Sequence, residues 1–292
     1  MNSITGSATH KIFSLAIIFF FIFLSSGCGG YITEGTVEED YSERSYEYFI
    51  PSGNNPDNPS PLIFVFHGAQ SSAWSMHYAT HFDEYAEEHN CIVIYPNSVE
   101  GYWNLNNACS AAYDDNYNDL GYVDYLLAKF SSEYSVDHDR IYATGFSLGA
   151  MFTMTVALER PNIFAAIAPL AGAFHITSTS KFNNANKIPI MILQGTLDFD
   201  EGGGEGDCER YSTLETVEQW AAHNGCDQNP TVEDLPDTGE DYIHVIRETY
   251  NNCSNNKETI FYKVEGGIHE WFMFDEFNAT ETIMEFFLRH SR

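Results

Sequence analysis

Basic residues are scarce in this chain. It has 13 lysines and arginines against 42 aspartates and glutamates among its 292 residues, for a formal net charge of −29. A protein with this charge repels nucleic acid and anionic membrane surfaces, so we exclude nucleic acid as a partner. The acidic residues are spread along the sequence and are not gathered in one tail, which indicates a strongly solvated surface.

Metal-binding spacings are also lacking. None of the six cysteines stands in a CxxC pair, the spacing that structural zinc sites use. The acidic runs at Asp114-Asp115 and from Asp198 to Glu201 do not have the spacing of an EF-hand. We expect neither a metal ion nor another cofactor.

One long apolar run, residues 12–24, follows Lys11 near the N-terminus. Its length and flanks are typical of a bacterial secretory signal and too short for a membrane span. The run ends in Leu24-Ser25-Ser26-Gly27-Cys28, which resembles a lipobox. It departs from the usual pattern at Ser25, three residues before Cys28, where leucine is usual. We predict export, with lipidation of Cys28 as the only membrane attachment at the bacterial cell envelope. The alternative is an ordinary signal peptide and secretion.

The remaining chain predicts one α/β domain. Residues 1–28 are the expected signal peptide, 29–44 a polar flexible tether and 45–292 the folded domain. Strand-like apolar runs alternate with helical ones, which indicates a mostly parallel, doubly wound sheet flanked by helices. The expected strands are 46–50, 62–66, 91–95, 141–144, 164–170, 188–193, 243–250 and 259–264. The expected helices are 81–89, 120–130, 151–158, 214–223 and 279–289.

The segment Gly145-Phe146-Ser147-Leu148-Gly149 follows one of these strands and precedes a helical run. A G-x-S-x-G pattern in that context forms a sharp turn that exposes a nucleophilic serine at the end of a sheet. The small glycines allow the turn because they lack a Cβ atom. We predict Ser147 as a nucleophile, whereas a structural turn serine is the alternative.

Two later strand ends carry the residues that would activate such a serine. Asp198 comes directly after the strand 188–193, and His269 follows the strand 259–264 and a glycine pair. The order serine, aspartate, histidine is that of α/β-hydrolases, in which the imidazole takes the serine proton and the carboxylate orients the imidazole. Asp200 is a local rival of Asp198, which we favour because it is closer to the strand end.

The strand 62–66 ends in His67-Gly68-Ala69-Gln70, whose amides can turn toward the same serine. We assign the N–H groups of Ala69 and Leu148 as the donors that stabilise an oxyanion. His67 is expected to organise this loop. Trp103 and Trp271 are candidate walls for the substrate, with core or rim packing as the alternative.

Five cysteines fall in the expected domain. Cys91 opens an apolar strand and is expected to be a buried free thiol. The other four, Cys109, Cys208, Cys226 and Cys253, can pair in three ways in an exported protein. The residues alone do not choose among these pairings.

Taken together, the motifs resemble the polyhydroxybutyrate depolymerase and feruloyl esterase group of α/β-hydrolases. The resemblance covers about residues 45–275 and is carried by segments that occur in the family's order: Phe66 to Gln70, Tyr102-Trp103-Asn104, Asn118 to Val123, Gly145 to Gly172, Gln194 to Asp198, Trp220 with Asn224-Gly225-Cys226, and Gly266 to Trp271. The chain departs from the family's usual pattern at Asn118, at Ile268 and at Phe272-Met273. The last two departures lie beside His269 and bear on substrate preference.

The resemblance implies Ser147 as nucleophile, Asp198 as orienting acid and His269 as base. It also implies a disulfide between Cys226 and Cys253, which leaves Cys109 with Cys208 as a second pair. The implied activity is hydrolysis of carboxylic esters through an acyl-enzyme, on feruloyl or aryl esters, polysaccharide-linked esters or hydroxyalkanoate polyester segments. The alternatives are an exopeptidase of the same fold and a surface-displayed binding protein with an inactive hydrolase fold.

Overall fold

The computed structural model describes residues 41–105, 117–174, 180–182, 185–198, 210–236 and 242–292. Within the chain, residues 39–292 form one compact unit. The expected signal peptide, most of the tether, Cys28, Cys109, Cys208 and Asp200 lie outside the described residues.

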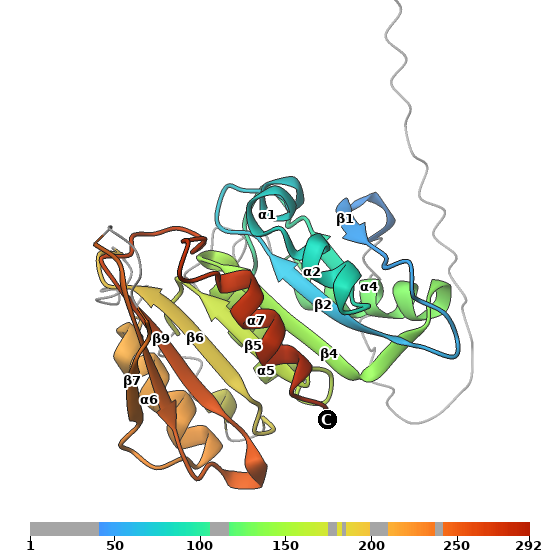
Figure 1. The fold of residues 1–292 in the computed structure, drawn as a ribbon. Coiled ribbons are helices and arrows are strands. Elements are labelled where there is room, and N and C mark those ends of the chain that lie inside the picture. The colour runs from blue at the N-terminus through green and yellow to red at the C-terminus, as the bar shows by residue number, and fades with distance from the viewer. Residues whose placement is uncertain (1–40, 106–116, 175–179, 183–184, 199–209, 237–241) are drawn as a thin grey trace, which may run out of the picture. The chain divides into compact units, whose positions relative to one another are not determined.

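A nine-stranded sheet forms the centre of this unit, in the order β1-β3-β2-β4-β5-β6-β9-β8-β7 (Figure 1). The six central strands, from β3 to β9, are parallel to one another. At the two sides β1 pairs antiparallel with β3, β8 pairs antiparallel with β9, and β7 pairs antiparallel with β8. In chain order the strands are β1 (Tyr46–Phe49), β2 (Ser60–Phe66), β3 (Ile92–Pro96), β4 (Val136–Phe146), β5 (Ala166–Leu170), β6 (Ile190–Gly195), β7 (Thr231–Asp234), β8 (His244–Tyr250) and β9 (Thr259–Glu265). The mostly parallel α/β sheet predicted from the sequence is confirmed.

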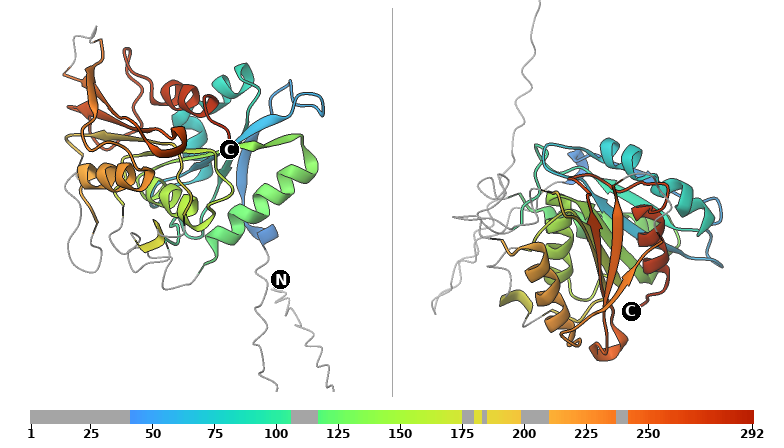
Figure 2. Two further views of the ribbon diagram at one scale, coloured as in Figure 1. Left: turned by 90° about the horizontal axis from the view of Figure 1, so that it is seen from below. Right: turned by 60° about the vertical axis from the view of Figure 1, so that its left-hand side comes forward.

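Helices cover both faces of the sheet, which explains why its central strands are apolar throughout. The described helices are α1 (Ala73–Thr80), α2 (Phe82–Glu88), α4 (Asp119–Glu133), α5 (Leu148–Glu159), α6 (Thr213–Asn224) and α7 (Ala279–Leu288). Side chains of α4, α5 and α6 pack into one core cluster, and those of α1, α2 and α7 into another on the opposite face (Figures 1 and 2). No described helix is long and apolar enough to cross a membrane.

Local signals set the ends of α6. Ser212 caps its first turn in a reciprocal pair with Glu215, and Gly225 ends it at a φ of 70°. The left-handed conformation at Gly225 is one that glycine adopts without a Cβ penalty. These caps fix where the chain leaves α6 toward Cys226.

Three parts of the fold differ from the sequence-based expectation. Helix α1 was not expected. Strand β4 begins at Val136 and not at Ile141 as expected. Its first five residues are partly exposed and mostly polar, so they lack the apolar run that marked the rest of the strand. Strand β7 is exposed along its whole length and carries no buried face, so its sequence shows no alternation of apolar residues. The two strands are held by pairing with neighbouring strands more than by a periodic pattern of their own.

The expected tether is too long at its C-terminal end. Tyr41–Glu43 form a 3-10 turn, and the guanidinium of Arg44 contacts the carboxylate of Asp119 at 2.5 Å. Both side chains are almost fully buried, and the Arg44 guanidinium also lies 4.0 Å from the ring centroid of Tyr122. A buried, paired charge fixes the segment against α4, so the folded part begins before Ser45.

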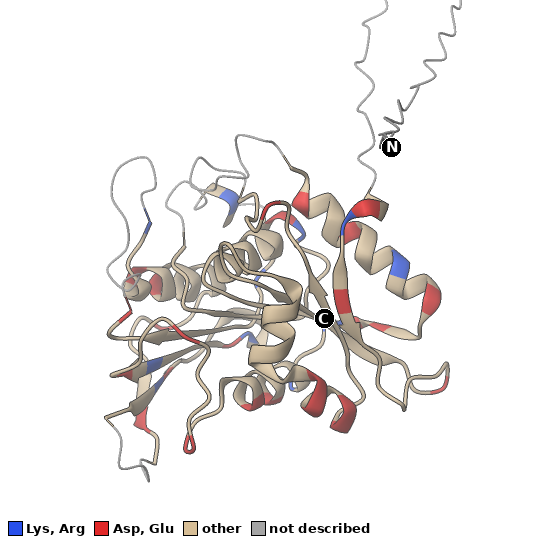
Figure 3. Ribbon diagram, turned by 90° about the horizontal axis from the view of Figure 1, so that it is seen from above, with Lys and Arg blue, Asp and Glu red and all other residues tan. Residues whose placement is uncertain are grey.

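Acidic residues are spread over the helices and strands, with few basic residues between them (Figure 3). His77 on α1 lies between two of these acidic residues. Its Nδ1 lies 2.6 Å from a carboxylate oxygen of Glu47, and its Nε2 lies 2.6 Å from one of Asp83. Partial burial lowers the pKa of His77, but the hydrogen bonds and charges of these two carboxylates outweigh it, and the net pKa is raised. Protonated His77 thereby joins β1, α1 and α2.

This geometry makes the stability contribution of His77 dependent on pH. Because the folded-state pKa lies above the unfolded value of about 6.5, the contribution is complete below that value and is lost as the pH rises through the folded pKa. We expect the difference in Tm between the wild type and His77→Gln to be largest near pH 6 and to shrink toward pH 9. Thermal unfolding across this range measures it. A difference that stays constant or grows with pH contradicts the account.

Candidate active site

Ser147 lies in the sharp turn between β4 and α5, with φ 56° and ψ −120°. A non-glycine residue at this φ is strained and needs support from its surroundings. The Ser147 amide donates to the Leu170 carbonyl at 3.0 Å, and the amides of Ala150 and Met151 donate to the Ser147 carbonyl. The turn is therefore held on both sides by the neighbouring strand and the first turn of α5.

The turn fits only because its neighbours lack Cβ atoms. A Cβ on Gly149 would lie 2.2 Å from the Phe66 carbonyl oxygen, and one on Gly145 would lie 2.5 Å from the Gly149 oxygen. Real Cβ atoms do not approach backbone oxygens this closely. The G-x-S-x-G spacing is thus a packing requirement between the ends of β2 and β4 and the start of α5.

The loop after β2 runs alongside the nucleophile turn. A Cβ added to Gly68 would lie 3.3 Å from the Ser147 Cβ, so the loop backbone is in contact with the serine side. Among the described residues, no acceptor pairs with the N–H of Ala69 or of Leu148. Unpaired amides of this kind beside a nucleophile are available to stabilise an oxyanion.

His67 organises this loop from inside. It is fully buried, its Nδ1 lies 2.7 Å from the Gly68 carbonyl oxygen, and its Nε2 accepts from the Ser98 amide at 3.1 Å. Burial lowers the pKa of His67, and the nearby positive charge of Arg44 lowers it further. A neutral ring that donates from Nδ1 and accepts at Nε2 satisfies both contacts. Ser98 lies beyond the motifs that the sequence analysis singled out, and no sequence pattern marks it.

Asp198 and His269 meet across the ends of β6 and β9. The Nδ1–H of His269 donates to Asp198 Oδ2 at 2.8 Å, and Asp198 is only 6% exposed. The His269 ring also packs against Phe146 with 4.7 Å between ring centroids, which places it beside the residue that precedes Ser147. The structure thus brings the three residues predicted from the sequence to the same end of the sheet.

Backbone contacts hold the two loops together. The Leu197 amide donates to the Gly267 carbonyl at 2.9 Å, and the Gly266 amide donates to Thr196 Oγ1 at 3.1 Å. A Cβ on Gly195 would lie 2.3 Å from the Gly267 oxygen, so the loops approach as closely as two backbones can. Thr196 stands in the same short segment as Asp198, and no motif in the sequence marks it for this contact.

The prediction that Trp103 lines a substrate cleft is wrong. Its side chain has no exposed surface, it stacks on Phe152 with 4.7 Å between centroids, and its Nε1 donates to the His67 carbonyl at 2.8 Å. A large aromatic side chain of this kind is most stable when buried with its N–H paired. Trp103 therefore holds the loop after β2 from the core side, through its hydrogen bond to the His67 carbonyl.

Trp271 is half-buried behind His269. Its Nε1 donates to Thr280 Oγ1 at 2.9 Å, and its ring meets Phe82 edge-on at 6.0 Å. These contacts join the His269 loop to α7 and α2, in agreement with the packing alternative for this residue. The exposed apolar side chains that precede Asp198 and His269 in the sequence are Leu197 and Ile268.

The structure contains the disulfide between Cys226 and Cys253 that the family resemblance implied. Cys91 is a buried free thiol, as predicted, and burial raises its pKa to about 12. The suggested partners Cys109 and Cys208 lie outside the described residues. In the described part of the chain, no group of three histidine, cysteine or acidic side chains could hold a metal ion.

Comparison with known proteins agrees with this geometry. The family model described as "Esterase PHB depolymerase" matches residues 44–188. Over these residues, just under half of its length, the chain is similar to this family of esterases. The match includes the Ser147 turn and the loop after β2, whereas Asp198 and His269 lie beyond it.

Two relatives of this chain have names that indicate different substrates. The chain is 26% identical over 234 residues to poly(3-hydroxyalkanoate) depolymerase C of Paucimonas lemoignei, covering 69% of this chain and 53% of the relative. It is 25% identical over 234 residues to feruloyl esterase B of Piromyces equi, covering 75% of this chain and 41% of the relative. The chain therefore spans about half the length of these relatives.

The fold of this chain is shared with a solved acetyl xylan esterase from Aspergillus awamori. The TM-score is 0.61 at 16% identity, and the match covers 86% of this chain and 96% of that structure. At this identity the likeness describes the fold alone.

The Asp198–His269 contact leads to a test with a matched control. In Asp198→Asn the amide cannot hold the imidazole in the required tautomer, and we expect kcat/KM for an aryl ester to fall by about 10⁴-fold. Asp200→Asn, at the rival carboxylate, is expected to keep near wild-type activity. Steady-state hydrolysis of p-nitrophenyl acetate measures both. A large loss in Asp200→Asn with little loss in Asp198→Asn contradicts the assignment.

Proposed function

We propose that the chain is an exported serine carboxylic-ester hydrolase. The observation that carries the proposal is the 2.8 Å contact between His269 Nδ1 and buried Asp198, beside the strained turn of Ser147. A serine, a candidate base and an orienting acid thus lie at one end of the sheet. The sequence around the serine matches a family of esterases. The fold and the family alone would not separate an active enzyme from an inactive one.

In the proposed mechanism Ser147 Oγ attacks the ester carbonyl carbon while His269 Nε2 takes its proton. The N–H groups of Ala69 and Leu148 stabilise the negative charge that develops on the carbonyl oxygen. The tetrahedral intermediate then breaks its bond to the alkoxy oxygen, which receives the proton from His269 as the alcohol leaves. Water then attacks the acyl carbon while His269 takes its proton. The bond from the acyl carbon to Ser147 Oγ breaks, Ser147 Oγ receives the proton back from His269, and the acid is released. Asp198 holds the imidazolium in each step without taking its proton.

The proposed substrates are feruloyl or other aryl esters and short hydroxyalkanoate polyester segments. The names of the relatives support both classes, one being a poly(3-hydroxyalkanoate) depolymerase and the other a feruloyl esterase. Exposed Leu197 and Ile268, at 68% and 52%, flank Asp198 and His269 and offer apolar contact to either substrate. The site as described favours neither class over the other.

Export is proposed from the sequence of residues 1–28 and is supported by the Cys226–Cys253 disulfide. Disulfides persist mainly in oxidising compartments outside the cytosol. Attachment through a lipidated Cys28 is the proposed form of membrane contact.

Hydrolysis of a matched ester panel tests the proposed function. The panel contains methyl ferulate, p-nitrophenyl acetate, p-nitrophenyl butyrate and a soluble 3-hydroxybutyrate oligomer. We expect turnover of at least one ester, and a loss of about 10⁴-fold or more in Ser147→Ala because this change removes the proposed nucleophile.

The control is the thermal unfolding of Ser147→Ala, which should retain a cooperative transition. If the folded wild type hydrolyses none of the four esters, the hydrolase proposal fails and the binding-protein alternative takes its place. If Ser147→Ala remains active, the nucleophile has been assigned wrongly.

A further inference from the structure

A hollow of about 690 Å³ lies at the C-terminal half of α6 and the loop that follows it. Its rim carries the polar side chains of Glu218, Gln219, Asp227, Gln228 and Asn229. Its floor is formed by Ala221, Cys226 and Tyr250, of which Tyr250 is only 4% exposed. The volume is within the roughly 300–1,000 Å³ of small-molecule sites.

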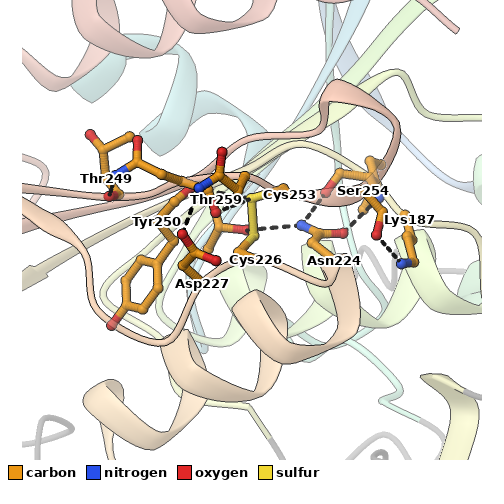
Figure 4. Close-up of a disulfide and its surroundings, with 12 residues drawn as sticks. Lys187, Asn224, Cys226, Asp227, Thr249, Tyr250, Cys253, Ser254 and Thr259 are labelled. Carbon is orange, nitrogen blue, oxygen red and sulfur yellow. Dashed lines mark hydrogen bonds between the residues drawn. A yellow bond between two sulfur atoms is a disulfide. The ribbon is translucent and has the colours of Figure 1, made fainter.

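A disulfide and hydrogen bonds hold the walls of the hollow in place. The Cys226–Cys253 disulfide joins the loop after α6 to the chain that leaves β8 (Figure 4). Beside it, the Asp227 amide donates to the Asn251 carbonyl at 2.8 Å, and Asn252 Nδ2 donates to Asp227 Oδ2 at 2.6 Å. A site whose walls are already ordered loses little entropy when it binds a ligand.

The charge of the hollow excludes anionic ligands. Glu218 and Asp227 line it, and among the described residues no lysine or arginine does. Burial raises the pKa of Tyr250 to about 12, and the charges of Glu248 and Glu218 add to this effect. The Tyr250 hydroxyl therefore stays protonated and can donate a hydrogen bond at any physiological pH.

The remaining chemistry matches a neutral molecule with many hydroxyl groups. The amides of Gln219, Gln228 and Asn229 each both donate and accept, and the two carboxylates accept from hydroxyls. The floor offers methyl groups, a disulfide and part of an aromatic ring to the C–H faces of such a molecule. A sugar ring presents this combination of hydroxyl edges and C–H faces.

The hollow lies at the end of the sheet opposite the triad. Tyr250 pairs with Thr259, the first residue of β9, whereas His269 follows the last residue of that strand, Glu265. Seven strand residues at about 3.3 Å each separate the two ends by about 20 Å. A ligand in the hollow cannot be the ester under attack at Ser147.

We propose that this hollow binds a short segment of a neutral polysaccharide and docks the protein on it, apart from the catalytic site. This binding does not depend on the proposed ester hydrolysis, so each can fail without the other.

The experiment is a calorimetric titration of the purified protein with xylohexaose and with cellohexaose, and with a galacturonate hexamer as the anionic counterpart. We expect saturable binding of at least one neutral hexamer and none of the anionic one. In Gln219→Ala/Asn229→Ala the affinity should fall by about tenfold or more, because two hydrogen-bonding amides are lost. Asn186→Ala is the matched control on the surface outside the hollow and should bind as the wild type does.

Hydrolysis of p-nitrophenyl acetate by the double variant should remain at the wild-type level, since neither residue is near the triad. Thermal unfolding of the double variant should show a cooperative transition like that of the wild type, which shows independently of any hydrolysis that the variant is folded. Absence of saturable binding to both neutral hexamers, equal binding of the galacturonate hexamer, or unchanged affinity in the double variant would each overturn the proposal.

Discussion

The strained backbone of Ser147 is the constraint on which the rest of the site depends. Its φ of 56° is tolerated because the carbonyl and amide of Ser147 are both hydrogen-bonded and because Gly145 and Gly149 leave room for the ends of β2 and β4. A side chain at either glycine would collide with backbone oxygens rather than with a movable side chain. The turn therefore fixes the relative position of the nucleophile, the loop after β2 and the first turn of α5 together.

Parallel strands then explain why residues far apart in the chain converge. β4, β6 and β9 all end at the same edge of the sheet, so the loops that follow them are neighbours in space. The close approach of Gly195 to Gly267 and the two hydrogen bonds between their loops place Asp198 against His269. Backbone contacts between the two loops therefore hold Asp198 and His269 in place before any substrate binds, as preorganisation of a site requires.

Much of this could be read from the sequence, because the signals were local and chemically specific. The buried parallel strands have continuous apolar runs, and the serine turn, Asp198 and His269 each follow such a run. Trp103 could not be placed in the same way, since an indole packs as well in a core as at a cleft and its partners Phe152 and His67 are distant in the chain. β7 was missed because an exposed edge strand has no apolar face to repeat. Arg44 was placed in a tether because its buried partner, Asp119, is recognisable only in three dimensions.

The central claim is that Ser147 carries the acyl group during turnover. Rapid-quench mass spectrometry of the protein mixed with excess p-nitrophenyl butyrate tests it most directly. The account predicts a transient mass increase of one butyryl group, located after digestion on the peptide that contains Ser147 and decaying as the ester is consumed. Ester turnover with the acyl group on another residue would contradict it.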